Sequence, residues 1–237
     1  MEALRAIGPI GSVSEKYVFV SSTAMVRKLS TYGYQQTDYR QQGEGGFSKH
    51  LIRMRKFTAL GISSGEFHEV VIINSHNASC ALQIYAGVFR SVCMNGIIVG
   101  DLTAPAIKVR HLKGSDFMDD FEASFEKYLD NQASVEFSID MLKNVYATTE
   151  RQDLFREKVN KKLGKQYDLS LTFRKRFDDT NDLWIMYNNA QERILRGTAM
   201  YVKNGVLKRQ RPVIAIDNTL IINKILWNAA IEVAQEC

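Results

Sequence analysis

The sequence predicts an α+β fold, with an N-terminal, mainly β half around one packed central helix and a mainly helical C-terminal half. Short β-branched and aromatic runs recur over 1–115, and apolar residues at helical spacing dominate 116–237. Strands first and helices later are typical of the α+β class, whereas alternating strands and helices would predict a parallel sheet. We expect a single domain over 1–237, because this length fits one large domain and no internal repeat divides the chain.

A strand, a helix and a polar segment are predicted at the N-terminus. The run YVFVSS at 17–22 is β-branched and aromatic, which favours a strand. A helix follows, with Ser22 or Thr23 as its N-cap and Gly33 just past its C-terminal end. The polar, glycine-rich segment 35–48 is either a loop or an extended hairpin arm with few core contacts.

The rest of the β-rich half is predicted to contain four strands and the central helix. In chain order these are strands over 49–60 and 69–74, a helix over 80–93, and strands over 94–100 and 107–112. The second of these strands is apolar on both faces, which indicates a central position in the sheet. The helix is predicted because Leu82, Tyr85 and Phe89 lie at helical spacing, after a polar bend with the sequence SHNAS.

The second half is predicted to be helical, with one basic hairpin or loop. The predicted helices span 116–129, 134–147, 149–164, 179–197 and 217–235. Thr149 and Gln152 have the spacing of a capping box, Gly197 is expected to end the fourth helix, and Asp217 or Asn218 to cap the last. The basic segment 202–215 precedes the last helix, and 168–177 is expected to be an extended or helical link.

The composition indicates a folded protein and gives no sign of a membrane or secreted class. Hydrophobic residues make up 45% of the chain and charged residues 24%, which is ordinary for a globular protein. No apolar run approaches the ~20 residues that span a bilayer, and the N-terminus does not read as a signal peptide, so we expect a cytoplasmic protein. Three cysteines are an odd and sparse set, typical of free thiols, and we expect no cofactor.

Several segments are similar to the phage/plasmid-like family known as domain of unknown function 932. The segments that carry the resemblance are KHLIRMR from Lys49, NSH from Asn74, AGVFR from Ala86, VCMNG from Val92, VRH from Val109 and NKILW from Asn223. The resemblance covers most of the chain and is strongest over 69–111. It implies an origin in a mobile element, and therefore a location in the host cytoplasm if a phage encodes the chain. It implies no settled activity.

The chain departs from the family pattern at one bend. The family continues its bend as His-Asp-Gly-Ser, whereas this chain has His76, Asn77, Ala78 and Ser79. Losing the carboxylate removes a candidate base or metal ligand, and losing the glycine restricts the turn to conformations that a Cβ tolerates. Any acid–base or metal site at this bend in relatives is therefore expected to be impaired in this chain.

His76 is the candidate catalytic residue, with Cys93 as a second candidate. A histidine general base needs a nucleophile and an orienting partner within hydrogen-bond reach, and Ser75, Ser79 and Cys93 are near in sequence. The alternative is that Asn74 and these serines cap the following helix. None of the four histidines forms a metal-binding pair with a nearby carboxylate, so no metal site is predicted.

Basic residues gather in three clusters, which are the candidate nucleic-acid-binding sites. The clusters are Lys49, Arg53, Arg55 and Lys56; then Lys161, Lys162, Lys165, Arg174, Lys175 and Arg176; then Lys203, Lys208, Arg209 and Arg211. We expect phosphate contacts from Arg53, Arg55, Lys56, Arg174, Arg176, Arg209 and Arg211, and base stacking by Tyr34 and Tyr39. Charge neutralisation with aromatic stacking is how single strands are bound without sequence preference. The alternative is a set of ordinary solvated faces.

Three functions remain open at this point. The first is a phage-type nucleic-acid-binding protein, acting without catalysis, which binds or anneals single-stranded DNA as a homo-oligomer in recombination or replication. The second is an interaction protein that blocks a host defence complex and has a host protein as its partner. The third is a hydrolase-like enzyme that uses His76.

Overall fold

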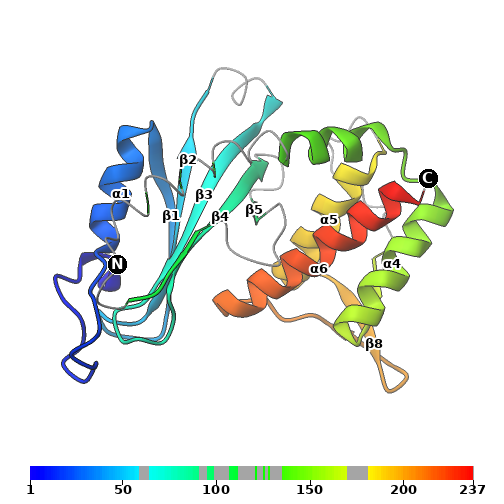
Figure 1. The fold of residues 1–237 in the computed structure, drawn as a ribbon. Coiled ribbons are helices and arrows are strands. Elements are labelled where there is room, and N and C mark those ends of the chain that lie inside the picture. Colours follow the sequence, from blue (N-terminus) through cyan, green and yellow to red (C-terminus); the bar gives the residue numbers. More distant parts are fainter. Residues whose placement is uncertain are drawn as a thin grey trace. The chain divides into compact units, whose positions relative to one another are not determined.

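The computed structural model describes most of the chain. The described residues are 1–58, 64–90, 95–98, 107–111, 121, 125, 128, 135–169 and 181–236. They group into two compact units: unit 1 comprises Met1–Arg90 and Asp101–Gln132, and unit 2 comprises Ser91–Gly100 and Ala133–Cys237. The predicted α+β class is confirmed, with an antiparallel sheet in the first half and mostly helices in the second (Figure 1). The prediction of a single domain stays a prediction.

Unit 1 is built on an antiparallel sheet with the strand order β1-β2-β3-β4, and β6 pairs with β4. Its elements are η1 (Ala3–Arg5), α1 (Ser22–Thr31), β1 (Tyr34–Gln42), β2 (Lys49–Lys56), β3 (Glu66–Asn74), β4 (Leu82–Arg90) and β6 (Ile107–Val109). In the register of the central strands, His50 lies opposite Asn74 and Arg55 lies opposite Glu69. The predicted strands at 49–60, 69–74 and 107–112 are thereby confirmed. The first and the last are shorter than predicted, whereas β3 begins three residues earlier, at Glu66.

The core of unit 1 lies on one face of this sheet. Alternate strand residues such as Ile52, Met54 and Ile72 contribute to it, because successive side chains of a strand point to opposite faces. They pack against Met25 and Leu29 of α1 and against three helical residues of the second half of unit 1, which are Phe121, Phe125 and Tyr128. These three residues belong to the predicted helix over 116–129, and the rest of that helix lies outside the described residues.

The predicted N-terminal helix is confirmed, whereas the strand before it is not. The side chain of Ser21 accepts a hydrogen bond from the backbone N–H of Ala24, so the N-cap lies one residue before Ser22. Gly33 follows the helix with φ +86°, a left-handed conformation that glycine adopts without strain. The segment 17–22 forms only an isolated bridge at Tyr17 before α1 begins. Its β-branched residues therefore do not form the predicted strand.

The predicted central helix at 80–93 is wrong, because Leu82–Arg90 is strand β4. Leu82, Ile84 and Val88 alternate along this segment and are buried, so it satisfies the period of a strand as well as that of a helix. It pairs with β3 along most of its length and with β6 at Leu82–Ile84, and this pairing decides in favour of the strand. The predicted helix cap at the bend is therefore wrong as well. The segment 35–48 is predicted to be either a loop or an extended hairpin arm. The hairpin arm is confirmed for the part of this segment that forms β1.

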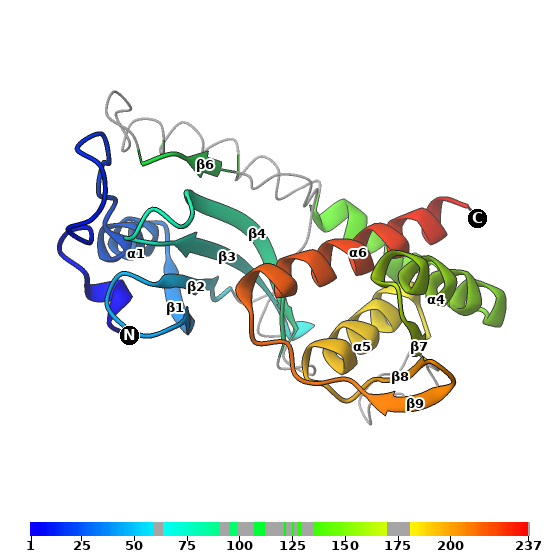
Figure 2. The same ribbon diagram turned by 90° about the horizontal axis from the view of Figure 1, so that it is seen from below.

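Unit 2 combines helices with a small antiparallel sheet in the order β7-β8-β9 (Figure 2). Its elements are β5 (Asn95–Ile98), a helical segment at 135–144, α4 (Thr149–Leu163), β7 (Gln166–Asp168), α5 (Leu183–Leu195), β8 (Met200–Lys203), β9 (Val206–Arg209) and α6 (Ile216–Gln235). The helix α6 packs against both α4 and α5. The predicted basic hairpin is confirmed as β8 and β9.

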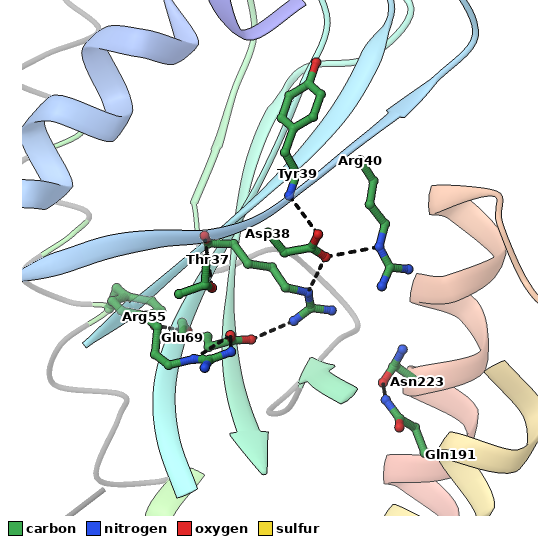
Figure 3. A network of polar contacts seen from close by, with 10 residues as sticks. Thr37, Asp38, Tyr39, Arg40, Arg55, Glu69, Gln191 and Asn223 are labelled. Carbon is green, nitrogen blue, oxygen red and sulfur yellow. Dashed lines mark hydrogen bonds and ion pairs between the residues drawn. The ribbon is translucent and has the colours of Figure 1, made fainter. Parts of the chain in front are cut away.

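Buried and exposed polar contacts join the helices of unit 2. Inside, Gln191 of α5 donates a hydrogen bond of 3.1 Å to Asn223 of α6 (Figure 3). Outside, Lys158 and Lys162 of α4 form ion pairs of 3.2 and 2.8 Å with Glu232 of α6. Among the residues that the structure describes, no helix is long and apolar enough to cross a bilayer.

Several predicted caps of unit 2 are wrong by a residue or more. Thr148, and not Thr149, caps α4 by accepting a hydrogen bond from Arg151 N–H. The helix α6 begins after Ala215 with no side-chain cap, so neither Asp217 nor Asn218 has the predicted role. Short-range sequence patterns place helices better than they place helix ends.

Candidate nucleic-acid interface

Unit 2 contains an open groove of about 1330 Å³ between the C-terminal end of α4, strand β7 and the turn of the β8–β9 hairpin. The residues that line it are Arg156, Glu157, Asn160, Lys161, Leu163, Gly164, Lys165, Gln166, Tyr167, Asp168, Val202, Lys203, Asn204 and Gly205. Residues from the second and the third predicted basic cluster meet here. Lys161 and Lys165 of the second cluster and Lys203 of the third therefore share one groove, although about forty positions separate them in the sequence.

Two turns position the lysines of this groove. Gly164 ends α4 in the left-handed conformation with φ +62°, so the chain turns at once into β7 and leaves Lys161 and Lys165 on either side of the turn. Asn204 and Gly205 have φ values of +53° and +73°, as a two-residue hairpin turn of type I′ requires. This tight turn fixes Lys203 at the rim of the groove.

Lys165 is held over two aromatic rings. Its Nζ lies 4.7 Å from the centroid of the Tyr201 ring and 5.7 Å from that of Tyr167, and 3.1 Å from Oε1 of Gln210. Burial, and then the neighbouring Tyr201, raises the pKa of Tyr167 to about 12, so this phenol stays neutral at physiological pH. Its hydroxyl donates to the same Gln210 oxygen at 2.8 Å. These contacts orient the lysine without neutralising its charge.

The groove and the adjoining hairpin carry an excess of positive charge. Four of the lining residues are cationic (Arg156, Lys161, Lys165 and Lys203) and two are anionic (Glu157 and Asp168), an excess of two positive charges. The hairpin and the chain after it add Lys208, Arg209 and Arg211, all exposed. No Asp or Glu occurs in the sequence between Glu192 and Asp217. Anions are therefore attracted to this side of unit 2.

The first predicted cluster, on β2, is placed differently. The side chain of Arg53 is 4% exposed, and its Nη1 donates to Oε2 of Glu69 at 2.8 Å. Arg55 donates to the other oxygen of Glu69 at 2.9 Å, and Arg53 Nε lies 4.0 Å from Asp38 Oδ2 (Figure 3). The buried carboxylate of Glu69 thus pairs with both arginines. We therefore leave Arg53 and Arg55 out of the candidate interface.

The two predicted stacking tyrosines lie beside this network. Tyr34 is 1% exposed, and its ring meets the edge of Phe125 in the core of unit 1. Tyr39 is half-buried, and its hydroxyl donates to Gln41 at 2.6 Å. Lys56 Nζ lies 5.8 Å from the Tyr34 ring centroid. A ring buried in a core has no face to offer a base, so Tyr34 gains no support as a stacking residue.

The remaining predicted site residues are placed as follows. Arg209 is exposed on β9, where its Nε donates to the carbonyl oxygen of Gly197 at 2.9 Å, and Arg211 is exposed just beyond. Arg174, Arg176 and Cys93 lie outside the described residues. Their predicted roles stay predictions.

His76 is part of a buried polar cluster in unit 1. It is 0% exposed, and its Nε2 donates to the carbonyl oxygen of Ala3 at 2.9 Å. The neighbouring Ser22 and His50 are buried too, with Ser22 Oγ 2.7 Å from His50 Nε2, and Asn74 Nδ2 donates to the same serine. Burial, and then the nearby His50, lowers the pKa of His76 to about 4. The cluster joins the N-terminal segment to the sheet, and the hydrolase-like alternative gains no support.

The sequence did not reveal the two carboxylates, Asp38 and Glu69, that pair with the arginines of the β2 cluster. Asp38 lies within the polar segment predicted as a loop or arm, and Glu69 is the first residue of the predicted apolar strand at 69–74. Pairing β2 with β3 in a hairpin register would have brought Glu69 opposite a basic residue, which is the one signal available. In the described part of the chain no group of three His, Cys, Asp or Glu side chains is placed to hold a metal ion.

Comparisons with known proteins identify a family. The family model described as "Domain of unknown function (DUF932)" matches residues 9–227. Two proteins of Escherichia coli strain K12, the UPF0380 proteins YafZ and YfjQ, are each 27% identical to this chain over 229 residues. The matched part covers 91% of this chain and 82% of each relative. No solved structure matches the chain.

Proposed function

The chain belongs to the DUF932 family, and from this starting point we propose that it binds nucleic acid through the phosphate backbone, at the groove of unit 2. The observation that carries the proposal is the convergence of Lys161, Lys165 and Lys203 on one open groove, from two separate parts of the sequence.

Electrostatics is the physical basis of the proposal. Lysines that neutralise phosphates release counterions, which is the main source of sequence-independent affinity for nucleic acid. The exposed Lys208 and Arg211 extend the positive surface beyond the groove, and the segment between Glu192 and Asp217 offers no carboxylate to compete with a phosphate. Lys165 is already held in place over the Tyr201 ring, so less side-chain entropy is lost on binding.

Single-stranded DNA is the form of nucleic acid that we favour. A flexible single strand can follow an open groove beside a small hairpin and present its phosphates to the lysines that line it. More specifically, we propose that copies of this chain anneal single strands in phage recombination or replication. The resemblance to a phage/plasmid-like family supports this setting.

The test is a fluorescence-anisotropy titration of the full chain with a labelled single-stranded oligonucleotide over a range of salt concentrations. We expect log Kd to depend linearly on log salt concentration. The triple variant Lys161→Gln, Lys165→Gln and Lys203→Gln should bind more weakly, and the magnitude of its salt slope should fall by about 2, because each phosphate contact on a single strand contributes about 0.7.

A matched control removes three charges elsewhere. The variant Lys16→Gln, Arg27→Gln and Lys108→Gln has the same net charge as the groove variant, but its three positions are exposed ones in unit 1. It should keep the salt slope of the parent protein. Absence of binding at low salt, or equal losses in the two triple variants, would contradict a binding site at the groove.

A further inference from the structure

Strand β9 is the outer strand of the small sheet of unit 2. The strand order β7-β8-β9 pairs it with β8 on one side, and no other strand among the described residues pairs with its second side. All four of its residues are exposed, with Leu207 60% exposed. An open strand edge is a template for pairing with another extended chain.

The hairpin register decides which backbone groups this edge presents. A two-residue turn makes Lys203 and Val206 the closing pair, whose backbone groups bond to each other across the hairpin. In an antiparallel pair such bonded residues alternate with residues whose N–H and C=O point away from the partner. Leu207 and Arg209 therefore direct their backbone N–H and C=O outward, along the open edge.

The side chains beside this edge specify the chemistry of a partner. Val206 and Leu207 are exposed aliphatic residues, and Lys208, Arg209 and Arg211 are exposed cations. A second copy of β9 would bring these cations against their own kind, and like charges across strands are destabilising. A partner segment in which carboxylates alternate with aliphatic residues would complement both the cations and the aliphatic side chains of this edge.

We propose that the open edge of β9 binds an extended acidic segment of a partner protein by strand addition. Backbone hydrogen bonds to Leu207 and Arg209 extend the sheet by one strand, which is a recurring mode of peptide recognition. The acidic side chains of the partner then meet the basic residues of the hairpin. This site lies on the outer edge of β9, whereas the groove is lined by β8 and the turn.

The probe is a fluorescein-labelled peptide of nine residues in which glutamate alternates with valine, titrated against the full chain. The informative variant is Leu207→Pro, because proline removes an N–H that points away from β8 and leaves the ladder between β8 and β9 intact. Its matched control is Leu207→Ala, which loses the same side chain but keeps the N–H. We expect Leu207→Pro to bind the peptide at least tenfold more weakly than Leu207→Ala.

Several outcomes would overturn the proposal. These are equal affinity of the two variants for the peptide, equal binding of a lysine–valine peptide by the parent chain, or sedimentation showing a dimer that Leu207→Pro alone dissociates. In the parent chain, slower amide exchange at Leu207 and Arg209 on adding the peptide provides a second readout if the proline variant folds poorly. Both variants should keep the affinity of the parent for single-stranded DNA. The proposal of strand addition at β9 and the proposal of nucleic-acid binding at the groove can therefore be disproved independently.

Discussion

Glu69 turns two arginines that are predicted to contact phosphates into ion-pair partners of a buried carboxylate. The carboxylate is completely buried on β3, where the register places it opposite Arg55 and within hydrogen-bond reach of Arg53. A buried carboxylate needs such partners, because the cost of removing a charge from water is otherwise large. Two arginines that look like a binding surface in the sequence thus help to hold the sheet together.

We predict that Glu69→Gln lowers the free energy of unfolding by about 3–5 kcal/mol, because it leaves the charges of Arg53 and Arg55 without their buried carboxylate. Urea denaturation followed by circular dichroism measures this loss. The control is Asp38→Asn, since the side chain of Asp38 is 39% exposed and its pairs should contribute about 1 kcal/mol or less. Equal losses in the two variants would contradict the role assigned to Glu69.

The histidine cluster gives unit 1 a dependence on pH. Burial lowers the pKa of His50, His76 and His111, and for His76 to about 4. Each is therefore neutral in the folded protein, while the unfolded chain takes up protons below pH ~6.5. Because the unfolded state binds more protons, stability is fully present above pH ~6.5 and falls as the pH falls towards 4.

We predict that His76 alone causes a loss of about 2 kcal/mol in unfolding free energy between pH 7.5 and pH 5, at about 1.4 kcal/mol per pH unit below 6.5. Urea denaturation at a series of pH values measures it. His68→Gln lies outside the cluster and should keep this loss, whereas His76→Asn should reduce it. A stability that is constant over this range would disprove the effect.

At the scale of elements, glycines decide where two helices of unit 2 end. Gly164 and Gly197 both adopt left-handed backbone conformations, with φ +62° and +73°. The space around them differs. A Cβ on Gly164 would meet no neighbour, whereas a Cβ on Gly197 would overlap the backbone of Pro212 and Arg211. The close approach at Gly197 is how the chain after β9 packs against the end of α5.

We predict that Gly197→Ala lowers the unfolding free energy by more than about 3 kcal/mol, because backbone strain adds to a steric overlap that no side-chain movement relieves. Gly164→Ala is the matched control, with backbone strain alone, and should cost about 1 kcal/mol. Thermal or urea denaturation compares them. If the two variants lose the same stability, the overlap at Gly197 is not significant.

The whole chain passes between the two units three times, after Arg90, Gly100 and Gln132. The segment Ser91–Gly100 belongs to unit 2, where β5 contacts α5 and α6. Unfolding of unit 2 therefore releases a segment whose two ends continue directly into unit 1. This connectivity leads us to expect cooperative unfolding of the two units.

We predict coincident unfolding transitions for the two units. Both tryptophans, Trp184 and Trp227, are buried in unit 2, so their fluorescence reports on that unit, while far-ultraviolet circular dichroism reports on both. The two signals should have the same urea midpoint, and Glu69→Gln in unit 1 should shift both equally. A fluorescence midpoint that ignores Glu69→Gln would mean two independent domains.

The sequence by itself determined the α+β class, the family, most helices of the second half, and a basic hairpin or loop at 202–215. These depend on local periodicity and turn chemistry, which neighbouring residues specify. Only the tertiary structure decided that Leu82–Arg90 is a strand, that Glu69 pairs with Arg53 and Arg55, and that Lys161, Lys165 and Lys203 share one groove. The reason is physical, because these outcomes depend on strand pairing, burial and contacts between residues far apart in the chain, and none of these leaves a local pattern.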